Sequence, residues 1–291
     1  MHPHNKGILI LILTTLIFAV QDSVTKLLAG GMPVVQFLGI RYLVFFIFAA
    51  WWTTRKRPLK QVVAVKNIPL QLARGVLLGL ESLVFAWTLK HLGIAQMHSI
   101  FVTFPLIVTA LSPFMLNERV GLLRWFAILM GFVGAIIIIA PGSLSFNRYS
   151  VLALVCATLY AFYNLLTRLA GKTDSAESSL FYTGLMAAAV NAPFLPFVWQ
   201  PISGYYTLLI MVLCTLSIVS HYLMIYALKL TPAVILQPFN YFVLPWVILL
   251  GMLIFNEVIP LHQWLGMLLV VAGGLLVAYH HYRPPQSSSA S

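Results

Sequence analysis

The chain has 291 residues, of which 61% are hydrophobic and 8% are charged, and its mean hydropathy is +0.96. An ordinary globular domain is about 25% charged, so a soluble protein this apolar would have almost no surface to show to water. The composition therefore indicates an integral membrane protein. The formal net charge of +11 comes from residues in short loops beside apolar spans, so bilayer orientation and anionic lipid headgroups explain it better than a nucleic-acid partner.

Apolar stretches follow one another along the whole chain. A helix crosses the bilayer in about 20 apolar residues, and short links marked by Gly or Pro separate the stretches. The first is no removable signal peptide, because Gln21, Asp22 and Lys26 interrupt it. Residues 284–291 predict a disordered tail. We expect an all-α membrane protein of ten transmembrane helices, at residues 7–28, 34–53, 68–89, 94–116, 122–140, 149–170, 179–199, 204–228, 232–255 and 261–281.

The basic residues predict the orientation of these spans. With a cytoplasmic N-terminus, 13 of the 17 Lys and Arg residues fall in or beside inner loops. Cytoplasmic loops carry an excess of Lys and Arg. We therefore expect a multi-pass protein of the cell (inner) membrane with both termini in the cytoplasm.

The sequence contains an internal repeat. Residues 87–138 resemble 226–277 at a spacing of 139, which places Asn117 and Glu118 on Asn256 and Glu257. At the same spacing Lys90, His98, Trp125 and Gly134 fall on Lys229, Gln237, Trp264 and Gly273, and in the weaker match of the first helices, at a spacing of 142, Asp22 and Lys26 fall on Asn164 and Arg168.

Five helices per copy is an odd number, so the two copies run in opposite directions. We expect one repeat over residues 1–145 and a second over 146–283. Inverted repeats are typical of transporters that work by alternating access, with substrate bound near the midplane between the halves.

The stretches "LNERVGLLRWFAILMGFVGAIII" and "FNEVIPLHQWLGMLLVVAGGLLV", with the opening Phe18, Ala19, Asp22 and Lys26, resemble the EamA-type repeats of the drug/metabolite transporter superfamily. The opening "DSVTKLL" looks most like a branch with S-adenosylmethionine-type carriers. The resemblance implies ten helices, cytoplasmic termini and secondary transport of small metabolites, often amino acids or amines and often outward.

Charged residues inside the spans are the first candidates for function, because a charge at the bilayer centre costs at least ~2.5–3.5 kcal/mol. Asp22 and Lys26 lie one helical turn apart and can form a pair that orients the helix. Alternatively, Asp22 meets Arg41 or a substrate ammonium group. Arg41 needs a carboxylate partner or binds a substrate carboxylate, which suits its planar fork.

Glu81 lies near the middle of its span with no opposite charge three or four residues away. Its partner is therefore on another helix, in the substrate, or a proton. A buried carboxyl group can hold a proton, so Glu81, with Asp22, is a candidate for proton coupling; a structural buried Glu fits equally well.

Further polar side chains complete the candidate substrate site. Pro105 and Pro245 remove a backbone donor in mid-membrane and predict kinks that shape a cavity or serve packing. Two mid-span acids among polar and aromatic residues favour a substrate with an amino or other cationic group. The remaining candidates are His98, Tyr160, Tyr163, Asn164, His221, Gln237, Asn240 and Tyr241.

Other function classes find less support in the sequence. A membrane-embedded enzyme would need a motif such as G-x-S-x-G or H-E-x-x-H, and neither occurs. A membrane scaffold would not explain mid-span charges or inverted repeats. We find no metal-ligand spacing, no Walker pattern and no sign of a cofactor. Glu118 and Glu257, at loop edges, are expected to cap helix N-termini.

Overall fold

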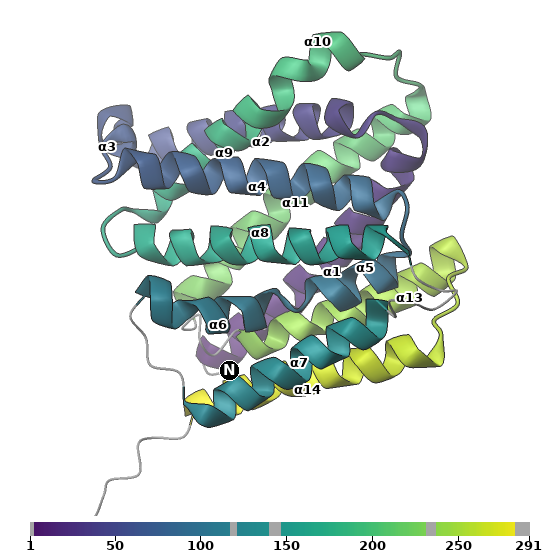
Figure 1. Ribbon diagram of the computed structural model, residues 1–291. Coiled ribbons are helices and arrows are strands. Elements are labelled where there is room, and N and C mark those ends of the chain that lie inside the picture. The colour runs from purple at the N-terminus through teal and green to yellow at the C-terminus, as the bar shows by residue number, and fades with distance from the viewer. Residues whose placement is uncertain (1–2, 117–120, 140–146, 231–236, 283–291) are drawn as a thin grey trace, which may run out of the picture.

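The computed structural model describes residues 3–116, 121–139, 147–230 and 237–282, and within these ranges every regular element is a helix. Most of the long helices run side by side, while α1 and α11 cross the others obliquely (Figure 1). In chain order the helices are α1 (Pro3–Gly31), α2 (Val34–Lys56), α3 (Leu59–Val63), α4 (Ile68–Leu89), α5 (Ile94–Phe101), α6 (Phe104–Leu116), α7 (Leu122–Ile139), α8 (Tyr149–Ala170), α9 (Ala176–Asn191), η1 (Ala192–Phe194), α10 (Leu195–Val198), α11 (Gly204–Leu230), η2 (Gln237–Phe242), α13 (Val243–Phe255) and α14 (Leu261–Tyr282).

Seven stretches in the described residues are long and apolar enough to cross a membrane, and three shorter apolar helices accompany them. The shorter ones are Trp125–Ile139, Phe239–Phe255 and Leu261–Leu276. The all-helical membrane architecture expected from the sequence is therefore confirmed, while the full set of ten spans stays a prediction. The repeat boundary at 145/146 and the expected tail at 284–291 fall on or beside residues outside the described ranges.

Two expected spans are interrupted helices. The span at 94–116 is divided at Val102–Thr103 into α5 and α6, and Pro105 lies in the first turn of α6. In the span at 232–255, η2 precedes α13, and Pro245 lies in the first turn of α13. Because proline has no backbone N–H and is tolerated at a helix start, both prolines begin new helical segments. Val102 falls on Tyr241 at the repeat spacing, so the two interruptions occupy matching positions.

The helices pack in pairs that follow the sequence repeat. α1 packs along α11, and α8 packs along α4, while α7 contacts α14 and α2 contacts α9. Under the repeat correspondence α1 matches α8 and α4 matches α11. The contact between α1 and α11 therefore corresponds, under the repeat, to the contact between α8 and α4.

The Asn256-Glu257 dipeptide forms a tight corner at the end of α13. Asn256 adopts a left-handed backbone conformation with φ 50°, which Asn tolerates better than most residues. The corner brings the Glu257 carboxylate to the start of α5, where Oε1 accepts from the Ile94 amide at 2.7 Å and Oε2 from the Ala95 amide at 3.1 Å. A Cβ on Gly93 would lie 2.8 Å from Oε2, so a side chain there would displace the carboxylate from this position.

Lys26 completes this junction. Its Nζ lies 3.3 Å from Glu257 Oε1 and donates a hydrogen bond to the Leu92 carbonyl. The expectation that Glu257 caps a helix is confirmed, and the capped helix belongs to the other half of the chain; Glu118 lies outside the described residues. The expected Asp22–Lys26 pair is wrong, because the Lys26 side chain reaches toward the polar helix end while Asp22 faces another partner.

We expect Glu257→Ala to lower the free energy of unfolding by about 2–4 kcal/mol, because two amides and a mostly buried ammonium lose their acceptor. The measurement is denaturant unfolding in detergent. Glu177→Ala is the control: its contact with Arg57 is long, at 3.8 Å, and more exposed, so about 0–1 kcal/mol is expected. Equal losses in the two variants would contradict the assigned role of Glu257.

Candidate functional site

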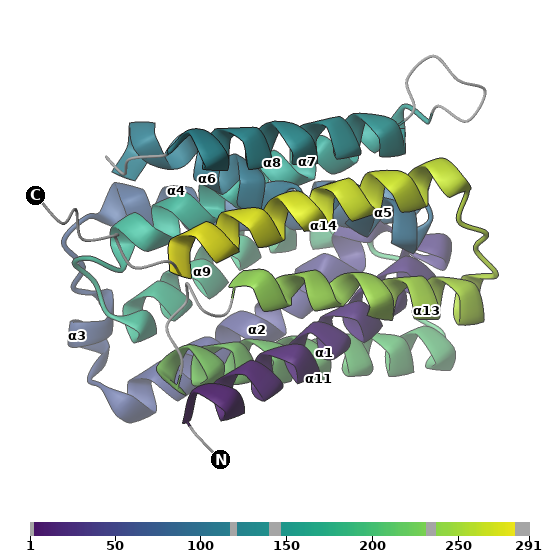
Figure 2. The same ribbon diagram turned by 90° about the horizontal axis from the view of Figure 1, so that it is seen from below.

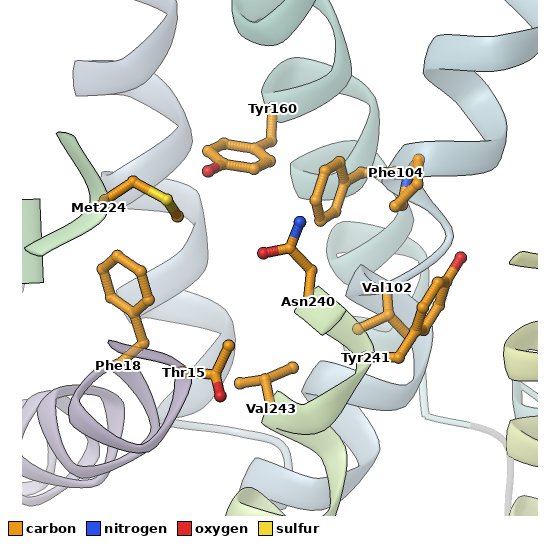
Figure 3. A pocket seen from close by; sticks show the side chains of 10 residues that line it. Thr15, Phe18, Val102, Phe104, Tyr160, Met224, Asn240, Tyr241 and Val243 are labelled. Carbon is orange, nitrogen blue, oxygen red and sulfur yellow. The ribbon is translucent and has the colours of Figure 1, made fainter. Parts of the chain in front are cut away.

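A small pocket opens where the two interrupted helices meet, and Figure 3 shows its lining. The lining comes from α1, the α5/α6 break, α8, α11, η2 and the start of α13. Asn240 projects between Tyr160 and Phe104 in Figure 3. The lining residues are Thr15, Phe18, Val102, Phe104, Pro105, Tyr160, Met224, Asn240, Tyr241 and Val243.

Aromatic rings build one wall of the pocket. Tyr160 meets Phe104 edge-on, with ring centroids 4.8 Å apart, and stacks on Tyr163 at 5.7 Å. Phe101 contacts Tyr160 at 5.3 Å from behind the break. Ring faces of this kind attract apolar rings and cations alike. Tyr160 and Asn240 add polar atoms to an otherwise apolar surface.

The pocket borders a cluster of buried charges. Glu81 is 5% exposed and Arg41 is 9% exposed, and Glu81 interacts electrostatically with both Asp22 and Arg41. The Tyr160 hydroxyl group also interacts electrostatically with Glu81 and Asp22. Tyr160, which lines the pocket, is therefore electrostatically coupled to two carboxyl groups.

Asp22 of α1 pairs with His98 of α5. Its Oδ2 lies 3.1 Å from His98 Nε2, although the alignment is too poor for a regular hydrogen bond. The His98 ring packs edge-on against Phe85 at 5.6 Å and against Phe101 at 6.2 Å. The contact joins α1 to α5 just before the α5/α6 break.

Arg41 has no carboxylate within 4 Å among the described residues; its Nε donates to Ser217 Oγ at 3.2 Å. Its guanidinium lies 5.3 Å from the Tyr42 ring centroid. Tyr42 bonds through its hydroxyl to Ser82, and Ser82 donates weakly to Glu81 Oε2 at 3.4 Å. Arg41 and Glu81 are thus linked through Tyr42 and Ser82, and no ion pair joins them.

The other predicted residues make contacts with neighbouring groups of the protein. Asn164 donates to the Tyr160 carbonyl at 2.8 Å, within its own helix. His221 Nδ1 lies 2.7 Å from the Ser217 carbonyl, and its ring packs against Phe45 at 4.8 Å. Tyr163 faces the Arg74 guanidinium at 5.6 Å. The side chain of Gln237 lies outside the described part of the structure.

Three predicted residues line the pocket itself, Tyr160, Asn240 and Tyr241, while Asp22, Arg41, Glu81 and His98 form the cluster beside it. Sequence reasoning missed the apolar lining, which includes Phe18, Phe104 and Met224. Apolar side chains in an apolar span carry no signal of their own. Among the residues of the helix break itself, Pro105 was already singled out as a kink.

Within the described residues, no group of three His, Cys, Asp or Glu side chains is placed to hold a metal ion. Cys156 and Cys214 are buried free thiols on different helices. The arrangement offers rings, an amide, hydroxyl groups and carboxyl groups for binding. We find in it no nucleophile with an adjacent base.

Comparison with known proteins agrees with this arrangement. The EamA-like transporter family matches twice, over residues 5–140 and 147–279. A riboflavin transporter from Vibrio cholerae serotype O1 is 27% identical over 274 residues, covering 93% of this chain and 92% of the relative. An S-adenosylmethionine uptake transporter from Rickettsia conorii is 26% identical over 186 residues, 63% of each chain. One crystal structure has the same fold, with a TM-score of 0.66 at 17% identity, covering 96% of this chain and 99% of that one.

Proposed function

Because the chain belongs to the EamA-like transporter family of the drug/metabolite transporter superfamily, we propose that it carries a small polar metabolite across the membrane by alternating access. The observation that carries the proposal is the pocket, which is lined from both halves of the chain at two matching helix interruptions. Interrupted helices at a repeat interface are where transporters bind their substrates.

The proposed architecture has ten transmembrane helices in two inverted repeats, residues 1–145 and 146–283, with both termini in the cytoplasm of an inner membrane. The paired contacts α1–α11 and α8–α4 support the repeat. The three shorter apolar helices supply the spans beyond the seven long ones. The distribution of Lys and Arg supports the orientation.

The proposed substrate is an amino acid, an amine or a related compound with a cationic group and an apolar or ring-shaped part. The charges of Asp22 and Glu81 act on Tyr160, and aromatic faces attract cations by about 0.5–2 kcal/mol. Asn240 projects into the pocket from η2, while Tyr241 lines it with its ring and turns its hydroxyl toward Gly274 of α14. The relatives' names, riboflavin and S-adenosylmethionine transporters, give two compounds to try first.

We further propose that Glu81 carries a proton during transport, with Asp22 as the second candidate. Glu81 is buried and has no cation within 4 Å among the described residues. A carboxyl group so placed can alternate between a proton and a substrate cation. Such exchange would couple transport, including export, to the proton gradient.

The pocket proposal predicts that Tyr160→Leu raises the KM for the transported compound about tenfold, because one ring face of the pocket is lost. The measurement is uptake into proteoliposomes of labelled riboflavin, S-adenosylmethionine and a panel of amino acids. The control is Phe162→Leu, two residues along α8, which lies in a different groove lined by α8 residues alone. A panel in which only simple anions or sugars are bound sinks the proposed substrate class.

Glu81→Gln should still exchange substrate across the membrane but lose accumulation driven by a pH gradient, because the amide keeps hydrogen bonding and cannot titrate. Exchange and pH-jump uptake are compared in the same proteoliposomes, with the half-buried Glu177→Gln as control. If Glu81 only neutralises Arg41, the variant should instead unfold more easily by several kcal/mol. A normal pH response would leave Asp22 as the acid to test.

The orientation is tested by labelling single cysteines in a variant that lacks Cys156 and Cys214. A cysteine at Lys60, in the basic stretch before α4, should react with an impermeant reagent only from the cytoplasmic side. One at Ser203, before α11, should react only from outside. Ser203 labelling from the cytoplasmic side alone would contradict the proposed topology.

A further inference from the structure

Aromatic and basic side chains lie together on the protein surface where α2 and α11 end and α1 begins. Figure 2 shows these three helix ends at the same end of the molecule. We call the rings the aromatic patch; they are Phe48, Trp51, Trp52, Tyr222 and Tyr226. Trp51 is 51% exposed and Tyr222 is 46% exposed, so the patch faces outward and not into the bundle.

The rings of the patch are continuous from one helix to the next. Phe48 stacks on Trp52 with centroids 5.9 Å apart. Trp52 of α2 meets Tyr222 of α11 edge-on at 5.5 Å, and Tyr222 is nearly parallel to Tyr226 at 6.5 Å. The patch is therefore a built surface that spans the junction between α2 and α11.

Three cations lie on the faces of these rings. Lys56 Nζ is 4.3 Å from the Trp52 centroid, Arg55 is 5.2 Å from Trp51, and Lys6 Nζ is 5.8 Å from Tyr226. Each ring holds the stem of its cation against the protein while the charge stays accessible. The three positive charges are thus distributed along the rings of the patch.

The three cations of the patch have no acidic partner in the described part of the chain. Among the described residues, none of the three cations has a carboxylate within 4 Å. The nearby acids are engaged elsewhere: Glu177 contacts Arg57 at 3.8 Å, and Asp174 accepts from Gln71 and from the Lys66 amide. The patch therefore combines uncompensated positive charge with exposed apolar surface such as Ile47, which is 65% exposed.

We propose that this surface binds the headgroup of an anionic phospholipid, with Lys6, Arg55 and Lys56 supplying the electrostatic attraction for its phosphate and an acyl chain along Ile47 and Trp51. Charge complementarity selects the anionic headgroup, and amphipathic Trp and Tyr rings suit the boundary between headgroups and hydrocarbon. Met224 of the pocket lies on α11 between Tyr222 and Tyr226. The lipid therefore contacts the same turns of α11 that carry the pocket.

The test is lipid titration of the purified full chain in detergent, followed by native mass spectrometry with phosphatidylglycerol and, in parallel, phosphatidylcholine. Phosphatidylglycerol should bind at least tenfold more tightly. Lys56→Gln and Lys6→Gln should each weaken it about fivefold, the effect of one cation near an anionic lipid. Lys56→Arg should restore binding, and Lys60→Gln, an exposed cation in α3 with no ring contact among the described residues, should change it less than twofold.

Three results would overturn the proposal. Equal affinity for the two lipids would remove the charge selection. Equal losses in Lys60→Gln and Lys56→Gln would reduce the effect to overall charge. Competition by soluble glycerol phosphate as strong as by the lipid would show that the acyl chain plays no part. Trp52→Leu provides an independent check, because it removes the central ring and keeps every positively charged residue.

Discussion

Inside hydrocarbon, a backbone N–H or C=O without a partner costs several kcal/mol, so a membrane helix can be interrupted only where protein or water satisfies the freed groups. Both interruptions, at Val102–Thr103 and at η2, lie against the pocket. The pocket and the interruptions are thus one feature. The prolines that begin α6 and α13 make continuous helices unfavourable beside the pocket.

The junction around Glu257 satisfies polar groups at the ends of helices. One carboxylate caps α5, holds Lys26 and closes the corner after α13. A negative charge at a helix N-terminus is favourable in itself, and here it also joins the two halves of the chain. The same end of the bundle therefore depends on a small number of polar contacts, which limits how the halves can separate there.

The buried charges of Arg41 and Glu81 each contact neutral side chains. Arg41 bonds to Ser217 and stacks on Tyr42, while Glu81 receives a weak bond from Ser82. Because no direct Arg41–Glu81 bridge forms, neither charge is fully compensated by the other. A site of this kind retains electrostatic attraction for a ligand or a proton, which a closed ion pair would lack.

The sequence alone determined the membrane class, the repeated halves, the prolines that interrupt helices and the polar residues Asp22, Arg41, Glu81 and Tyr160, because charge, proline and repetition stand out against an apolar background. It did not determine partners: Lys26 was expected beside Asp22, and the structure places it on Glu257, more than 200 positions away in the chain. Nor could it show that Phe18, Phe104 and Met224 line the pocket. Ion pairs and pocket walls depend on which helices pack together, and only the tertiary structure decides that, because every apolar helix face is equally compatible with lipid and with a neighbouring helix.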